Sequence, residues 1–252
     1  MSTKNKNHIQ KGFTLVEMAV VAPVVILVIG TFIYAIVTMT GDVMAGRAAN
    51  VLAYNIQDTL NRIEADFRIS KGYLSTNSFD ISTPQGRLND STKFTTPILP
   101  FSPLIVESYA TSDSPLSPTR SIIYKKDTPN LCNSTEKYQN IPLTLNIVYF
   151  VRSINNINTL WRRVIMPADY NSVGCGTPWQ IPSCSIGSID LFCKTNDEKL
   201  IEGLDSDGFN IVYDEFAGSI KPGAITVTIK ATSTVAGRSI TKSGTISAIN
   251  AN

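Results

Sequence analysis

The amino-acid sequence predicts an α+β protein in which one long N-terminal helix packs on an antiparallel β-sheet. Two observations predict this class. An apolar run and then an amphipathic stripe fill about the first quarter of the chain, and both are typical of helices. Alternating apolar and polar residues, which are typical of half-buried strands, recur through the second half. A chain of 252 residues is long enough for this rod and one further domain of ordinary size.

The apolar run follows a basic leader. The leader carries Lys4, Lys6 and Lys11 and no acidic residue. From Met18 to Met39 no residue is charged, and this length is sufficient for a bilayer-spanning helix of roughly 20 residues. Because positively charged flanks remain in the cytoplasm, we expect a single-pass inner (cytoplasmic) membrane protein with a cytoplasmic N-terminus and an extracytoplasmic C-terminal domain.

Glu17 is the acidic residue at the start of this apolar segment. A charge near the bilayer centre costs about 2.5–3.5 kcal/mol, so we expect the chain to use it. An ordinary secretory signal peptide, cleaved near Ala45, would have a shorter apolar run. A plain signal-anchor helix explains the length and the orientation but gives Glu17 no role.

Residues 11–17 read Lys-Gly-Phe-Thr-Leu-Val-Glu and resemble the processing site of type IV prepilins and secretion-system pseudopilins. The resemblance implies that prepilin peptidase cleaves between Gly12 and Phe13 and N-methylates Phe13. It also implies that Glu17 pairs with the amino terminus of a neighbouring subunit during filament assembly. The implied partners are other pilin or pseudopilin subunits, the peptidase, an assembly ATPase, a platform protein, and membrane lipid before assembly.

Beyond the membrane segment, the helical pattern continues as one apolar stripe among polar residues. The stripe residues recur at helical spacing, which is typical of an amphipathic helix. They are Leu52, Ile56, Leu60, Ile63 and Phe67. We expect the helix to continue to about Ser70, with Gly72 as the stop signal, and to lay this stripe on a β-sheet.

The remainder of the chain is β-rich. Residues 75–118 are rich in Ser, Thr and Pro and predict a long irregular segment, in which Ile98-Leu99 and Leu104-Ile105-Val106 pack against the core. Strands are predicted at 121–124, 143–151, 160–165, 209–213, 225–230 and 239–249. The polar turn at 153–158 joins the second and third of these strands into a hairpin, and Gly237 lies in the turn before the last strand.

The predicted hairpin carries a second resemblance. Tyr149, a polar turn and then Leu160, Trp161, Arg162 and Arg163 are similar to a pattern in minor pilins and minor pseudopilins of the J class. The alternative is a hairpin with an aromatic residue on its buried face and its arginines on a solvated face.

All four cysteines follow the membrane segment, in a compartment that we expect to be oxidising, so two disulfides are expected. They are Cys132, Cys175, Cys184 and Cys193. Three connectivities are possible, and the sequence does not choose among them. A structural zinc site normally uses more closely spaced cysteines. Three of the four lie in an insertion near 171–193, which we expect to be stabilised by disulfides.

The composition argues against an enzyme. The only histidine is His8, in the leader, so a processed chain would lack the base of Ser-His and Cys-His catalysis. No pair of acids stands out as a catalytic site, and we expect no cofactor. Asp205 and Asp207 are a weak candidate for calcium, because the further ligands of an EF-hand loop are missing.

The charge balance also excludes a class of partner. The chain has 22 basic and 20 acidic residues, a net charge of +2, and loss of the leader lysines would bring it close to neutrality. Nucleic-acid binding depends on an excess of Lys and Arg, so no direct contact with nucleic acid is expected.

These observations predict a structural subunit of a type IV pilus or type II secretion-like filament, either a minor pilin or a pseudopilin, and not an enzyme. The alternative is a single-pass membrane-anchored adhesin or binding protein that does not polymerise. The expected divisions are a leader at 1–12, a transmembrane and filament-core helix at 13–41, its amphipathic continuation at 42–71, and an extracytoplasmic β-rich domain at 72–252.

Overall fold

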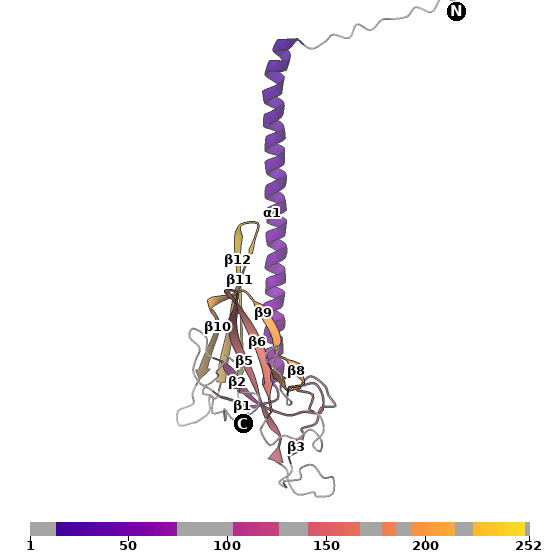
Figure 1. Ribbon diagram of the computed structural model, residues 1–252, viewed down its shortest axis with the longest axis vertical. Helices are drawn as coiled ribbons and strands as arrows, with labels where there is room; N and C mark the ends of the chain where they lie inside the picture. The colour runs from indigo at the N-terminus through magenta and orange to yellow at the C-terminus, as the bar shows by residue number, and fades with distance from the viewer. Residues whose placement is uncertain are drawn as a thin grey trace, which may run out of the picture.

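The computed structural model describes residues 14–74, 103–125, 141–166, 178–184, 193–214 and 224–249. It confirms the α+β class, because one long N-terminal helix, α1 (Leu15–Phe67), packs against antiparallel sheets (Figure 1). The N-terminal part of α1 extends away from the sheets, and its C-terminal part lies along them.

Two antiparallel sheets make up most of the described β-structure. The larger has the order β1-β2-β5-β6-β9, with strands Ser70–Leu74, Leu104–Tyr109, Thr144–Ile154, Ile157–Ile165 and Glu198–Glu202. The smaller has the order β10-β11-β12, with strands Leu204–Asp214, Ala224–Val235 and Arg238–Ile249. Two short ladders pair β3 (Tyr124–Lys125) with β4 (Ile141–Pro142), and β7 (Ser183–Cys184) with β8 (Thr195–Asn196).

The apolar stripe of α1 is buried, as predicted. Its five members are each at most 7% exposed and belong to the main core with residues of both large sheets. Gly244 of β12 lies against this stripe, and a Cβ atom there would lie 2.8 Å from Leu60 Cδ1 and 2.9 Å from Ile56 Cγ2. Glycine at this position therefore lets the sheet come close to the helix.

The helix ends three residues earlier than the predicted Ser70. Phe67 is its last residue, and Ser70 already begins β1. Gly72 therefore does not stop the helix but lies inside β1, next to an irregularity in the pairing of β1 with β2. Pairing along the edge of the larger sheet supplies backbone hydrogen bonds that another helical turn would compete for.

The β5–β6 hairpin forms as predicted. Ile154 pairs with Ile157, so Asn155 and Asn156 are the two turn residues. Their φ angles are 52° and 62°. Asparagine tolerates this left-handed conformation better than most residues, and a pair of positive φ values matches the twist of a two-residue hairpin.

The alternation predicted for 225–230 is also confirmed. Ile225, Val227 and Ile229 of β11 are fully buried toward α1. On the opposite face, hydroxyls of β11 and β12 pair across the strands, as in Thr228 with Thr245 at 3.1 Å. A turn at Ala236 and Gly237, with φ angles of 51° and 76°, leads into β12.

Residues 104–109 correct the prediction of an irregular segment from 75 to 118. They form β2, which lies between β1 and β5 in the larger sheet. Leu104, Ile105 and Val106 are at most 1% exposed because both faces of this strand are covered. A strand buried on both faces shows no polar alternation, which is the signal that the prediction required. Ile98 and Leu99 lie outside the described residues.

Smaller differences concern other strands. The strand predicted at 121–124 is instead an isolated bridge at Ile122 followed by β3 at Tyr124–Lys125. The edge strand β9 was not predicted, because Glu198–Glu202 is mostly charged and exposed.

Candidate functional site

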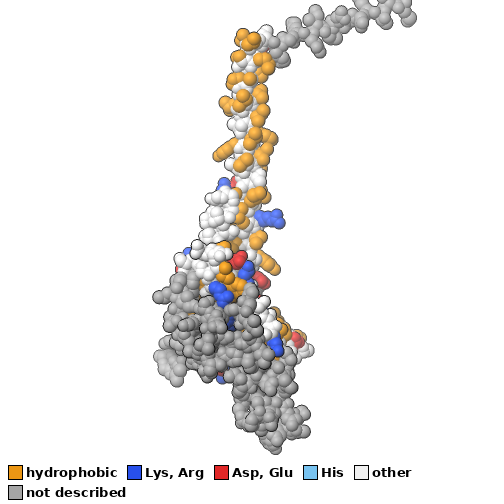
Figure 2. Space-filling model, in the orientation of Figure 1, with side chains coloured by type: hydrophobic (Ala, Val, Ile, Leu, Met, Phe, Trp, Pro, Cys, Tyr) orange, Lys and Arg blue, Asp and Glu red, His pale blue; other side chains and the backbone are white. Residues whose placement is uncertain are grey.

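The first candidate site is the apolar surface of α1. From Leu15 to Met39 the large apolar side chains of the helix are exposed, and this stretch is long and apolar enough to cross a membrane. Figure 2 shows hydrophobic side chains covering the part of the helix that extends beyond the sheets. Exposed apolar side chains continue past the uncharged run at Val43 and Tyr54, which are 71% and 72% exposed. A surface of this kind requires lipid or another protein as its partner.

Glu17 lies at the N-terminal end of this surface and caps its own helix. Its Oε2 accepts hydrogen bonds from the Thr14 backbone N at 2.9 Å and from Thr14 Oγ1 at 2.8 Å. In return, the Glu17 backbone N donates to Thr14 Oγ1 at 3.3 Å. This reciprocal arrangement is a capping box, and the pattern Thr-x-x-Glu before an apolar run is its sequence signal. The cap was not among the predicted features, although this pattern identifies it.

The capping box engages one oxygen of the Glu17 carboxylate. The other oxygen, Oε1, has no hydrogen-bond partner among the described residues. A carboxylate oxygen accepts two hydrogen bonds, so Oε1 could receive an ammonium group without loss of the cap. Gly12 and Phe13, the predicted processing residues, lie outside the described residues.

The second candidate site is a buried polar cluster at the other end of α1, and we call Asp66, Tyr149 and Arg162 the clasp. Arg162 of β6 donates to Asp66 from Nε to Oδ2 at 2.7 Å and from Nη2 to Oδ1 at 3.1 Å. The Tyr149 hydroxyl of β5 donates to the same Oδ2 atom. The side chain of Asp66 is 0% exposed and that of Arg162 is 6% exposed. The clasp therefore fixes the last turn of α1 to the middle of the larger sheet.

Burial and charge determine protonation in the clasp. Burial, and then the Asp66 carboxylate, raise the pKa of the Tyr149 hydroxyl well above its usual value. Burial alone would lower the pKa of Arg162, but Asp66 outweighs it and the net direction is upward. The tyrosine thus stays a hydrogen-bond donor and the arginine stays charged, which is the combination that satisfies a buried carboxylate.

The clasp continues to the surface through Glu198 of β9. Glu198 Oε2 accepts from Arg162 Nη1 and from Arg62 Nη2, each at 3.3 Å. The Arg62 guanidinium also lies over the ring of Trp179, with 5.3 Å between its Cζ and the ring centroid. Because Glu198 is 44% exposed, water screens its ion pairs with the two arginines more than it screens the clasp.

Arg163 forms a second buried ion pair on the opposite face of the same strand. Its Nε and Nη2 donate to the two carboxylate oxygens of Asp197 at 2.9 Å and 2.6 Å, and both side chains are 1% exposed. The alternative for this hairpin, in which its arginines lie on a solvated face, is therefore wrong. Successive residues of a strand point to opposite faces, and here both faces are covered, so Arg162 and Arg163 are each buried against a different acid.

The calcium candidates lie around a lysine. Lys230 Nζ is 3.2 Å from Asp205 Oδ2 and 3.2 Å from Asp207 Oδ1. Hydrogen bonding to Lys230 lowers the pKa of Asp207, and the same contact raises the pKa of Lys230. A calcium ion here would have to displace this ammonium group. No group of three or more His, Cys, Asp or Glu in the described part of the chain is placed to hold a metal ion.

One disulfide joins Cys184 to Cys193, with 5.7 Å between the Cα atoms. It closes the loop between β7 and β8, which pair side by side. Stapling of part of the predicted insertion is thus confirmed. Cys132 and Cys175, like residues 171–177 and 185–192 of that insertion, lie outside the described residues.

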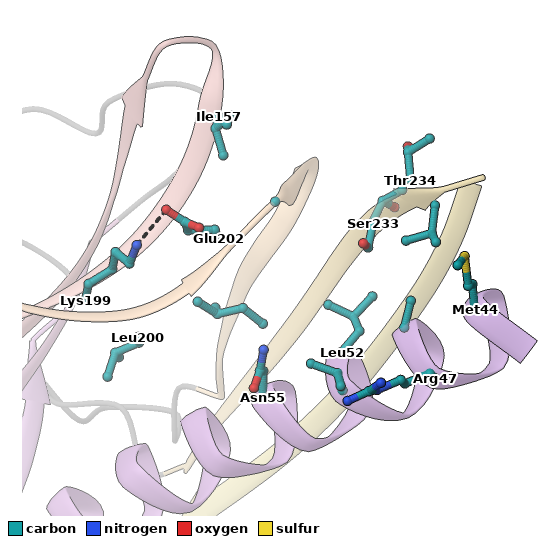
Figure 3. Close-up of a pocket in the computed structure, with 16 residues that line it drawn as sticks. Met44, Arg47, Leu52, Asn55, Ile157, Lys199, Leu200, Glu202, Ser233 and Thr234 are labelled. Atoms are coloured by element: carbon teal, nitrogen blue, oxygen red, sulfur yellow. Dashed lines mark hydrogen bonds and ion pairs between the residues drawn. The ribbon is translucent and has the colours of Figure 1, made fainter. Parts of the chain in front are cut away.

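An open groove of about 810 Å³ runs between α1, β9 and the end of β11 (Figure 3). Met44, Arg47 and Leu52 line it from the helix, and Ser233 and Thr234 line it from β11. On the β9 side Lys199 Nζ lies 2.6 Å from Glu202 Oε1. The described residues that line the groove include no cluster of catalytic groups.

Comparison of the chain with protein-family models, with curated proteins and with solved structures finds no match.

Proposed function

We propose that the chain is a pilin-like structural subunit, a minor pilin or pseudopilin, of a type IV pilus or type II secretion-like filament. Prepilin peptidase would cleave it at Gly12-Phe13 and methylate Phe13. Its helix would hold it in the membrane and then enter the helical core of the filament, moved by the assembly ATPase and platform protein.

The observation that carries this proposal is the unequal burial of one continuous helix. The stripe from Leu52 to Phe67 is buried in the domain, whereas the apolar residues from Leu15 to Met39 are exposed on all sides. A membrane anchor needs the second feature only. A filament subunit needs both, because the domain must follow its helix when that helix leaves lipid and packs among other helices.

The exposed apolar residues beyond the uncharged run add support. Val51 and Tyr54 lie past the region that a bilayer would cover, yet they are 52% and 72% exposed. Packing with helices of neighbouring subunits would bury them. A monomeric anchored adhesin gives them no such partner.

The position of Glu17 adds a second line of support. Its carboxylate stands at the head of the helix with one oxygen held by Thr14 and the other without a partner among the described residues. The amino terminus of a neighbouring subunit could donate to the second oxygen. Such a pair in an apolar surrounding would set the axial register between subunits, because breaking it leaves an uncompensated charge.

The first test is the N-terminus of the mature chain. Mass spectrometry of the protein from its native host should find N-methyl-Phe13 as the first residue. An intact Met1, or cleavage near Ala45, would show that the chain is not processed as a prepilin.

The second test separates the charge of Glu17 from its capping role. Glu17→Gln keeps an acceptor for Thr14 but removes the charge, whereas Thr14→Val removes the hydroxyl of the cap and keeps the charge. We expect Glu17→Gln to leave processing intact and to lower the amount of subunit in sheared filaments several-fold. Thr14→Val should have a much smaller effect. Equal incorporation of Glu17→Gln and wild-type protein would refute the pairing role and favour a non-polymerising anchored protein.

A further inference from the structure

The β11–β12 hairpin extends farther along α1 toward the N-terminus than the other strands do (Figure 1). Its tip is held to the helix, because Arg238 Nη1 donates to Asp42 Oδ1. This contact joins residues that are far apart in the sequence, and both side chains remain more than half exposed. The tip is therefore fixed in height along the helix and accessible from outside.

The height of the tip relative to the membrane follows from the helix. Asp42 is three residues beyond Met39, the last residue of the uncharged run, which at 1.5 Å per residue is about 4.5 Å. The headgroup region on each side of a bilayer is roughly 5–7 Å thick. Asp42, and with it Arg238 and the turn at Ala236, would thus lie at the level of the lipid headgroups when the helix spans the membrane.

The charges near the tip suit anionic lipid. The Arg238 guanidinium uses one donor on Asp42 and has others left, since it carries five. Arg47 of α1 lines the groove that Thr234 and Val235 also line, and Lys242 lies farther down β12. Neither Arg47 nor Lys242 has an acidic partner among the described residues, so this end of the domain carries an excess of positive charge.

Apolar residues accompany these cations. Val43 and Met44, which follow Asp42 on the helix, are 71% and 52% exposed, and Ala236 at the hairpin tip is exposed as well. Exposed apolar groups interspersed with Arg and Lys are characteristic of surfaces that lie in the membrane interface.

We propose that the tip of the β11–β12 hairpin, Val235–Arg238, is a lipid-contacting strut that rests on the extracytoplasmic leaflet and binds anionic phospholipid headgroups through Arg238. This inference depends on the membrane insertion of α1 that is part of the proposed function. The strut gives the unassembled subunit a second point of contact with the bilayer, beside the helix itself. It would hold the domain at a defined height and tilt before the subunit is extracted.

The test is photocrosslinking of the full chain in vesicles of phosphatidylcholine and phosphatidylglycerol. A photoreactive amino acid is placed at Ala236, at Tyr124 of β3 near the opposite end of the molecule, and at Val28 in the helix. Tyr124 is the matched control, because it is 50% exposed and far from the membrane. We expect lipid adducts by mass spectrometry at Ala236 and Val28, and several-fold fewer at Tyr124.

The labelled positions distinguish the lipid-contacting strut from the membrane insertion of α1. Adducts at Val28 without adducts at Ala236 above the Tyr124 level would overturn the strut and leave membrane insertion standing. Absence of adducts at Val28 would overturn both. The same probe at Ser239, also exposed, gives an independent reading should the Ala236 variant fail to fold.

The preference of the strut for anionic lipid is measured separately. Among adducts at Ala236, phosphatidylglycerol should be enriched several-fold over its share of the vesicle lipid, and the enrichment should fall as salt is raised. Replacing Arg238 by glutamine should abolish the enrichment, while Arg120→Gln, a control far along the sequence from the tip, should not. Enrichment that survives the Arg238 substitution would refute a role of this arginine in headgroup binding.

Discussion

Arg162 of β6 and Asp66 of α1 are joined by two hydrogen bonds, at 2.7 Å and 3.1 Å, although 96 residues separate them in the sequence. Their contact links the end of the helix to the centre of the larger sheet. The Tyr149 hydroxyl completes the site from the neighbouring strand, opposite Arg162 in the register. The helix therefore cannot detach from the sheet without exposing or orphaning a buried charge.

The clasp predicts a strong coupling between its two charged members. Asp66→Ala leaves the Arg162 guanidinium buried without its main partner, and we expect this change to lower the free energy of unfolding by about 3–5 kcal/mol. Replacing both residues together, as Asp66→Leu with Arg162→Met, should cost less than Asp66→Ala alone. Denaturant unfolding of the full chain in detergent gives the free energy of unfolding of each variant. Additive losses for the two positions would contradict the coupling.

Two buried tyrosines predict opposite responses to removal of the hydroxyl. The Tyr149 hydroxyl donates to Asp66, whereas the Tyr213 hydroxyl is buried and has no hydrogen-bond partner among the described residues. We expect Tyr149→Phe to lower stability by about 1–3 kcal/mol, because an acceptor loses its donor. Tyr213→Phe should be neutral or stabilising, since it removes an unsatisfied polar group. The same sign for both variants in unfolding experiments would contradict this assignment.

Tyr213 also predicts a loss of stability at alkaline pH. Burial raises the pKa of Tyr213 to about 12. In the unfolded chain this hydroxyl ionises near its ordinary value, about 10, so above that pH the unfolded state releases a proton that the folded state retains. The contribution of Tyr213 is complete below pH 10 and is lost as the pH rises toward 12. The free energy of unfolding, measured from pH 8 to 11, should therefore decline more steeply for wild-type protein than for Tyr213→Phe. Parallel curves would contradict this prediction.

Gly244 predicts that the contact between the helix and β12 does not tolerate a larger side chain at this position. An added methyl group would lie within 3 Å of Leu60 and Ile56, so Gly244→Ala should destabilise the protein by about 1–3 kcal/mol through overpacking. Ser243→Ala is the control on the adjacent, outward-facing position, and a change there should stay within about 0.5 kcal/mol. Thermal unfolding of both variants compares them. An equal effect at the two positions would show that the helix does not approach β12 this closely.

The helix stripe and the β5–β6 hairpin were predictable because their signals are local. A stripe from Leu52 to Phe67 has helical period, and a polar turn between alternating segments defines a hairpin. The strand β2 was not predictable in this way, because burial on both faces removes the alternation that distinguishes a strand from an apolar patch in a loop.

The buried ion pairs could not be predicted from the sequence, because their partners come together only in the fold. Arg162 and Arg163 look like surface residues in the sequence, and only the structure brings Asp66 and Asp197 to them from two different segments. Long-range pairs of this kind leave no spacing rule in a single sequence. The capping box of Thr14 and Glu17 is the opposite case, since its residues are three apart and the pattern alone could have identified it.

The way α1 is fastened to the domain also determines how the protein would carry a mechanical load. A pull along the helix axis acts on the stripe, on Gly244 of β12 and on the clasp in parallel, so these contacts must yield together. A pull at right angles would instead peel the helix away one turn at a time, beginning at the exposed pair of Asp42 and Arg238. Resistance to forced unfolding depends on the barrier along the direction of pulling, so this domain should be strong along its rod and weak across it.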